Sequence, residues 1–92
     1  MTNRIIIKYC PKCRWLLRST WMAQELLTTF EQEIDELALQ PAGSGVFEVM
    51  ANDQLVWSRK IAQRFPEIKE LKQLVRDVIA PHKSLGHSDR KK

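Results

Sequence analysis

The sequence predicts a small α/β domain whose elements follow the order β-α-β-β-β-α. The first observation is a run of three isoleucines at residues 5–7, which is typical of a buried strand. The second is the segment behind it, where apolar residues recur every three or four positions as in an amphipathic helix. The third is a pair of short apolar runs on either side of Asn52-Asp53, which indicates a hairpin. At 92 residues the chain has room for one such domain with one modest core.

The first strand is expected at residues 4–9. Its three consecutive β-branched side chains suit a central strand that is covered on both faces of the sheet. Cys10-Pro11-Lys12-Cys13 ends this strand, because Pro11 has no N–H to donate to a neighbour. Proline is also tolerated at the first position of a helix, so a helix is expected to open at this motif.

That first helix is expected to run from Cys13 to about Phe30. Arg14, Arg18 and Glu25 fall on the side opposite the apolar positions, as an amphipathic helix requires. The predicted apolar stripe consists of Trp15, Leu16, Ser19, Met22, Ala23, Leu26, Leu27 and Phe30.

A second strand is expected near residues 34–40 and ends at Pro41, although Ile34 and Leu37 would equally continue the helical stripe. The loop Pro41-Ala42-Gly43-Ser44-Gly45 follows.

Residues 46–51 and 54–59 are then expected to form the hairpin. Asn52 and Asp53 tolerate the left-handed backbone conformation that a two-residue turn needs. This turn places Val49 opposite Val56 and Met50 opposite Leu55.

A last helix is expected from Pro66-Glu67 to just before Pro81, with apolar residues at helical spacing. Its stripe consists of Ile68, Leu71, Leu74, Val75, Val78 and Ile79. A parallel crossover followed by a hairpin gives a four-stranded mixed sheet in the order 2-1-3-4, with two helices. This is a thioredoxin-like arrangement over residues 1–80, and residues 81–92 are predicted to form a basic, disordered tail.

The charge distribution argues against a nucleic-acid partner. The chain carries a net charge of +4, but residues 1–80 hold 11 Lys+Arg and 10 Asp+Glu, so most of the excess lies in the tail. The longest apolar run is the three-residue isoleucine run, so no membrane partner is expected. Only residues 1–3 precede the first predicted strand, which leaves no room for a signal peptide and makes a cytoplasmic location the expectation.

The pair Cys10 and Cys13 is the candidate catalytic site. A strand, a C-x-x-C motif and a helix in succession indicate thiol–disulfide chemistry, because unpaired N–H groups at a helix start favour the reactive thiolate. Two alternatives remain open. In the first alternative, the cysteines are inert core residues. In the second, they form half of a zinc site that His82 and His87 complete. The zinc site needs histidines that at least 68 residues separate from the motif. Neither a metal nor another cofactor is therefore expected.

Three segments together resemble the selenoprotein W-like proteins of the SelT/SelW/SelH (Rdx) family. They are Ile5–Cys13, the block Gly45-Val46-Phe47-Glu48-Val49-Met50, and Leu55–Lys60. The resemblance covers residues 4–80 and implies a thioredoxin-like fold, a role in redox homeostasis, and glutathione or protein thiols as partners. It places Cys13 at the position that holds selenocysteine in the selenium-containing members. Thioredoxin logic instead makes Cys10 the attacking sulfur, so the order of attack stays open.

Five further residues are candidates for substrate or partner binding. Pro11 and Lys12 lie within the motif, and Trp15 follows it by two positions. Ser44 and Gly45 lie where thioredoxin-like proteins usually have a cis-proline, and they either admit a substrate backbone or only form the turn. The predicted function is therefore thiol–disulfide redox chemistry, with a non-catalytic protein-binding module as the alternative.

Overall fold

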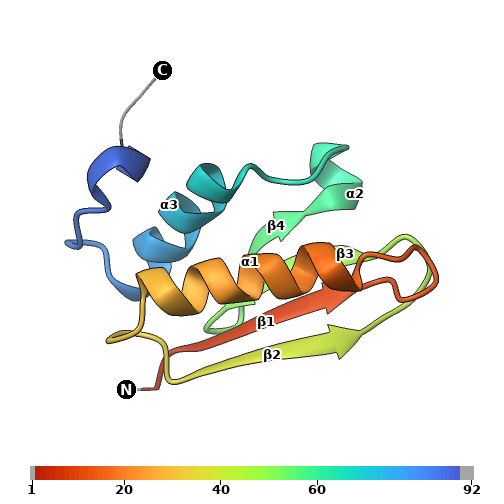
Figure 1. Cartoon of the computed structure of the whole chain (residues 1–92), viewed down its shortest axis with the longest axis horizontal. Helices are drawn as coiled ribbons and strands as arrows, with labels where there is room; N and C mark the ends of the chain where they lie inside the picture. The colour runs from red at the N-terminus through yellow and green to blue at the C-terminus, as the bar shows by residue number, and fades with distance from the viewer. Residues whose placement is uncertain (1, 90–92) are drawn as a thin grey trace.

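A four-stranded sheet in the order β2-β1-β3-β4 organises the chain (Figure 1). The computed structural model describes residues 2–89. β1 pairs with β2 in parallel and with β3 in antiparallel fashion, and β3 and β4 form the predicted hairpin. The strands are β1 (Arg4–Tyr9), β2 (Glu36–Pro41), β3 (Phe47–Ala51) and β4 (Gln54–Ser58). The mixed sheet and its strand order confirm the predicted thioredoxin-like arrangement.

Two long helices, α1 (Leu16–Thr29) and α3 (Ile68–Ile79), match the predicted ones in number and in their order along the chain. A short helix that the sequence did not predict, α2 (Arg59–Ala62), follows β4 directly. It forms because the Ser58 hydroxyl accepts a hydrogen bond from the Ile61 N–H at 3.4 Å, which caps a helix where the predicted strand would continue. The fourth, a 3₁₀ helix, is η1 (Gly86–Asp89).

The core lies between the sheet and the two long helices. Alternate residues of β1 and β3 point into it, and α1 and α3 supply the opposing side chains. Of the predicted α1 stripe, Leu16 and Leu27 stay 48% and 43% exposed. The buried hydrophobic residues are Ile5, Ile7, Tyr9, Cys10, Met22, Ala23, Leu26, Phe30, Phe47, Val49, Ala51, Trp57, Leu71 and Val75.

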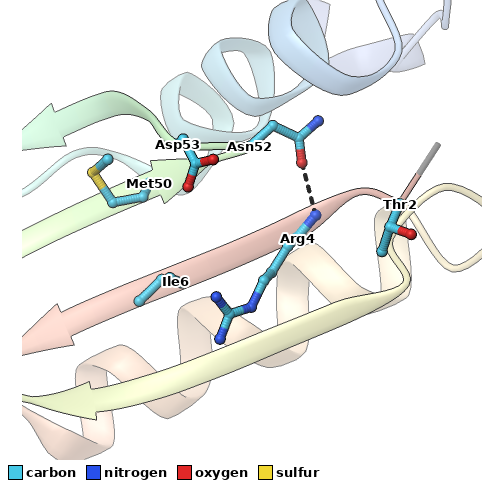
Figure 2. Close-up of a pocket in the computed structure, with 6 residues that line it drawn as sticks. All are labelled: Thr2, Arg4, Ile6, Met50, Asn52 and Asp53. Atoms are coloured by element: carbon cyan, nitrogen blue, oxygen red, sulfur yellow. Dashed lines mark hydrogen bonds between the residues drawn. The ribbon is translucent and has the colours of Figure 1, made fainter.

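The prediction that both faces of β1 are covered is wrong. β1 is central in the sheet, but Ile6 is only half-buried. Figure 2 shows Ile6, Met50 and Arg4 on the face away from α1, where they line a shallow groove of about 400 Å³. Both long helices pack on the same side of the sheet. The isoleucine run, which is typical of a strand covered on both faces, therefore has the side chain of Ile6 on an open face.

The pairing of residues across the hairpin differs from the predicted pairing because the hairpin contains a bulge. Met50 pairs with Leu55 as predicted, but Val49 pairs with Trp57 and not with Val56. A bulge inserts one extra residue into a strand and shifts every later pair. The shift turns the larger Trp57 side chain into the core, where its Nε1–H donates to the Arg64 carbonyl at 3.1 Å.

Part of the predicted tail contacts α3. The Arg76 guanidinium donates to the Lys83 carbonyl at 2.9 Å and to the Asp89 carboxylate at 3.0 Å. The same carboxylate accepts from the Leu85 N–H at 2.7 Å. Tertiary contacts therefore continue past residue 80, where the sequence predicted a disordered tail to begin. Residues 90–92 of that tail lie outside the described residues. Within the described range, no helix has both the length and the apolar character needed to cross a membrane.

Ser19 is a polar residue in the apolar core. Its side chain is fully buried on α1, and its Oγ has no hydrogen-bond partner. An unsatisfied buried hydroxyl costs about 1–3 kcal/mol, and alanine is also the better helix former. We expect Ser19→Ala to raise the free energy of unfolding by about 1 kcal/mol, measured by urea denaturation. A lower free energy of unfolding in the variant would contradict the account of this hydroxyl.

The start of α3 depends on a charged pair. Glu67 and Glu70 form a capping box, and the Glu70 carboxylate accepts two hydrogen bonds from Arg64 at 2.8 and 2.9 Å. These bonds are the main reason that the pKa of Glu70 lies below its usual 4.5. A carboxylate with a lowered pKa stabilises the fold above 4.5, and this stabilisation is lost as the pH falls through the folded-state pKa.

We therefore expect Glu70→Gln to weaken the dependence of stability on pH below 4.5. Glutamine keeps the capping hydrogen bond but cannot form the ion pair. Urea denaturation of both proteins at pH 7 and at about pH 3 measures the difference. Equal losses of stability in the two proteins would contradict the prediction.

Candidate redox site

The C-x-x-C motif directly follows the carboxyl end of β1, where the chain leaves the sheet. Cys10 follows Tyr9, which pairs with Pro41 at the end of β2 and with Phe47 at the start of β3. The Ala42 N–H donates to the Tyr9 carbonyl at 2.7 Å, so the β2–β3 loop begins beside the motif. In Figure 1 the motif loop, this second loop and α2 gather at the same, right-hand end of the molecule.

Cys10 and Cys13 form a disulfide, with their Cα atoms 5.3 Å apart. The two sulfurs differ in their surroundings. Cys10 is fully buried, whereas Cys13 is partly exposed. The backbone N–H of Cys13 donates to the Cys10 Sγ at 3.2 Å. The pair predicted from the sequence is therefore brought together, with one residue buried and the other partly exposed.

The motif does not open the first helix, contrary to the prediction. Residues 11–14 form a turn closed by the Arg14 N–H, which donates to the Pro11 carbonyl at 3.1 Å. Arg14 has a φ of 62°, and a residue in this left-handed region cannot continue a right-handed helix. α1 starts only at Leu16, after Trp15 as its N-cap residue. The N–H that donates to the Cys10 sulfur therefore belongs to the motif turn and not to the first turn of α1.

Aromatic rings and guanidinium groups pack together around Trp15, which follows the motif by two positions. The ring of Phe65 lies 4.9 Å from that of Trp15 and 5.0 Å from that of Phe47, both in edge-on geometry. The Arg18 guanidinium sits 4.2 Å above the centre of the Phe65 ring, and that of Arg59 lies 5.0 Å from the Trp15 ring. Trp15, a predicted binding residue, is therefore half-buried in this cluster.

The other predicted binding residues lie on two neighbouring loops. Pro11 and Lys12 are exposed on the motif turn. Ser44 and Gly45, with Arg59 and Lys60 among others, line a groove of about 330 Å³. Gly45 has a φ of 75°, and the Val46 N–H donates to the Gly43 carbonyl at 3.2 Å, so this glycine is needed for the turn itself.

Phe65 and Arg59 were not predicted as site residues. They lie about 50 positions after the motif and reach it only through the packing of the segment between β4 and α3. No local pattern in the sequence marks either residue. Among residues 2–89, no group of three or more His, Cys, Asp or Glu side chains is placed to hold a metal ion.

Known proteins share this fold. The Rdx family model matches residues 4–77. A selenoprotein W-related protein from Vibrio cholerae is 49% identical, with a TM-score of 0.82, and the match covers 85% of this chain and 98% of that one. A protein from Bordetella parapertussis is 51% identical, with a TM-score of 0.81, covering 84% of this chain and 98% of that one. No protein with a curated description matches. The chain is therefore a selenoprotein W-like member of the Rdx family, with cysteine at both positions of the motif.

Proposed function

We propose that the chain is a thiol–disulfide redox protein in which Cys10 and Cys13 cycle between disulfide and dithiol. The observation that carries the proposal is the bonded pair on the turn after β1, with one sulfur buried and the other within reach of solvent. Its partners are glutathione or the thiol of a protein client, and its role is redox homeostasis in the cytoplasm. Membership of the Rdx family supports a redox-type role.

Because the two cysteines differ in exposure, we assign their sulfurs different roles in thiol–disulfide exchange. In reduction of the disulfide, a client thiolate attacks the accessible Sγ of Cys13, and the S–S bond breaks. The Cys10 sulfur leaves with the electron pair as a thiolate, and the Cys13 N–H at 3.2 Å donates to it. A second client thiolate then attacks the client sulfur of this mixed disulfide and displaces the Cys13 sulfur as a thiolate, which yields the protein dithiol and the client disulfide.

In the opposite direction the reduced protein reduces a client disulfide. The Cys13 thiolate attacks one client sulfur, and the other leaves as a thiol. Cys10 then attacks Cys13 in this mixed disulfide, and the original disulfide closes while the second client thiol departs. Cys13 thus exchanges with the client and Cys10 resolves the intermediate. This assignment agrees with the place of selenocysteine in related proteins, which corresponds to Cys13.

Reaction stoichiometry tests the proposal. The reduced protein is mixed with oxidised glutathione, and free thiols and disulfides are counted by alkylation and mass spectrometry. We expect one protein disulfide to form for each glutathione disulfide consumed, with release of two reduced glutathione molecules. The double variant Cys10→Ser/Cys13→Ser should consume none. Formation of no protein disulfide over a range of glutathione concentrations would overturn the proposal.

A further inference from the structure

The first two turns of α1 expose large apolar side chains beside the motif. Leu17 is 84% exposed, Leu16 48% and Trp21 47%. On the same helix Ser19 is fully buried, so the exposed side chains are not those that hold α1 against the sheet. Apolar side chains gathered on a surface, and not needed for the core, are typical of an interaction site.

This apolar surface is continuous with the redox motif. A groove of about 280 Å³ is lined by Tyr9, Pro11, Arg14, Leu16 and Leu17, and Pro11 lies between the two cysteines in the chain. Small-molecule sites usually measure roughly 300–1,000 Å³. The groove is therefore of a size to take a single side chain of a larger partner, and two of its lining residues, Pro11 and Arg14, belong to the motif turn.

The charges around the motif are mainly positive, and the carboxylate of Glu48 lines the same groove as Arg59 and Lys60. Within residues 2–89, ion pairs engage Arg4, Arg64, Lys72, Arg76 and Lys83, none of which belongs to the motif turn. The cationic side chains on and near the motif turn have no such acidic partner in the described part of the chain. They are Lys12, Arg14, Arg18, Arg59 and Lys60.

Two of these cations are already fixed in place. The Arg18 and Arg59 guanidinium groups stack on the rings of Phe65 and Trp15. The Arg59 Nε is buried and has no hydrogen-bond acceptor. An ordered cation loses less side-chain entropy on binding, and a set of unpaired cations attracts a partner of opposite charge.

We propose that this surface docks a protein client: a polypeptide segment whose reactive cysteine is flanked by a large apolar residue and by acidic residues. The apolar residue enters the groove at Leu16 and Leu17, and the carboxylates meet the cations around the motif. Glutathione carries no large apolar side chain, so it reacts at the same disulfide without using the groove. The inference rests on the proposed redox function and deepens it by naming the client.

Synthetic peptides test the client chemistry. The probes are three acetylated nonapeptides with one cysteine: one with leucine and aspartates beside the cysteine, one with lysines in place of the aspartates, and one with serine in place of leucine. Each peptide reduces the Cys10–Cys13 disulfide, and the rate is divided by the rate of the same peptide with a small aromatic disulfide. This division removes differences in thiol reactivity among the peptides.

We expect the acidic, leucine-containing peptide to react about tenfold faster than either of the others at low salt, with the advantage over the lysine peptide shrinking at high salt. Leu17→Ser should lower its rate about tenfold, because burial of one leucine side chain is worth more than a factor of ten. Leu27→Ser is the matched control, since Leu27 is 43% exposed near the far end of the same helix. It should leave the rate unchanged.

The rate with glutathione separates this inference from the proposed function. Leu17→Ser should not change it. Equal rates for the three peptides, or a Leu17→Ser variant that reacts with the acidic peptide as the wild type does, would overturn the docking inference while the redox function stands. A disulfide that neither glutathione nor any peptide reduces would overturn both.

Discussion

Cys13→Ser is expected to slow exchange with external thiols and disulfides strongly, whereas Cys10→Ser is expected to trap the client. Cys13 is the sulfur that a partner can reach, since Cys10 is fully buried. In Cys10→Ser the remaining Cys13 thiol reacts with oxidised glutathione, and no second cysteine resolves the product. A stable mixed disulfide should therefore accumulate to one glutathione per protein.

In Cys13→Ser the remaining thiol is the buried Cys10, and buried thiols are inert. Its reaction with oxidised glutathione should be slower than that of Cys10→Ser by a factor on the order of 100. Intact-mass spectrometry over time measures both reactions, and circular dichroism of both variants controls for folding. Faster trapping on Cys10 than on Cys13 would reverse the assigned roles.

Phe30→Ala is expected to remove a large part of the stability of the fold. Phe30 is fully buried where α1 ends, and it belongs to the core formed with β1 and β3. Truncating a buried phenylalanine costs about 3–5 kcal/mol, because apolar burial is lost and a cavity remains. A domain of this size has a total stability of only about 5–15 kcal/mol.

The exposed Leu17 provides the control for this substitution. Because Leu17 is 84% exposed, Leu17→Ala should change the free energy of unfolding by no more than about 0.5 kcal/mol. Denaturation by guanidinium chloride, monitored by circular dichroism, measures both variants. A loss below about 1 kcal/mol for Phe30→Ala would contradict the description of the core.

The arrangement of the sheet was predictable because local patterns determine it. Three isoleucines, a long amphipathic segment and a two-residue turn at Asn52-Asp53 restrict the order of strands to very few solutions. Asn52 and Asp53 have φ values of 48° and 67°, as the turn requires. What the patterns do not encode is how many helices cover each face. The side chain of Ile6 therefore lies on an open face of the sheet.

Errors of detail arose where one residue adopts a conformation that its type does not signal. Arg14 takes the left-handed region, which is uncommon for a residue other than glycine, and this delays the start of α1 to Leu16. A bulge beside Val49 shifts the hairpin register by one residue. Neither feature leaves a trace in hydrophobic periodicity, because periodicity reports burial and not backbone dihedral angles.

The pairing of the two cysteines was predictable, and the surroundings of the pair were not. Cys10 and Cys13 are close in sequence, so their pairing follows from the motif. Phe65 and Arg59 join Trp15 only through tertiary packing. The exposure of the two cysteines also depends on packing, and the roles proposed for them rest on this difference.

A redox titration of the cysteine pair tests the central claim most directly. The protein is equilibrated in buffers with a range of ratios of reduced to oxidised glutathione, and the thiols at Cys10 and Cys13 are quantified separately by alkylation and peptide mass spectrometry. We predict that both thiols appear together in one reversible two-electron transition, with about 30 mV for each tenfold change in the ratio of dithiol to disulfide. A pair that stays in one state throughout, or two cysteines that titrate independently, would contradict the assignment of a redox-active disulfide.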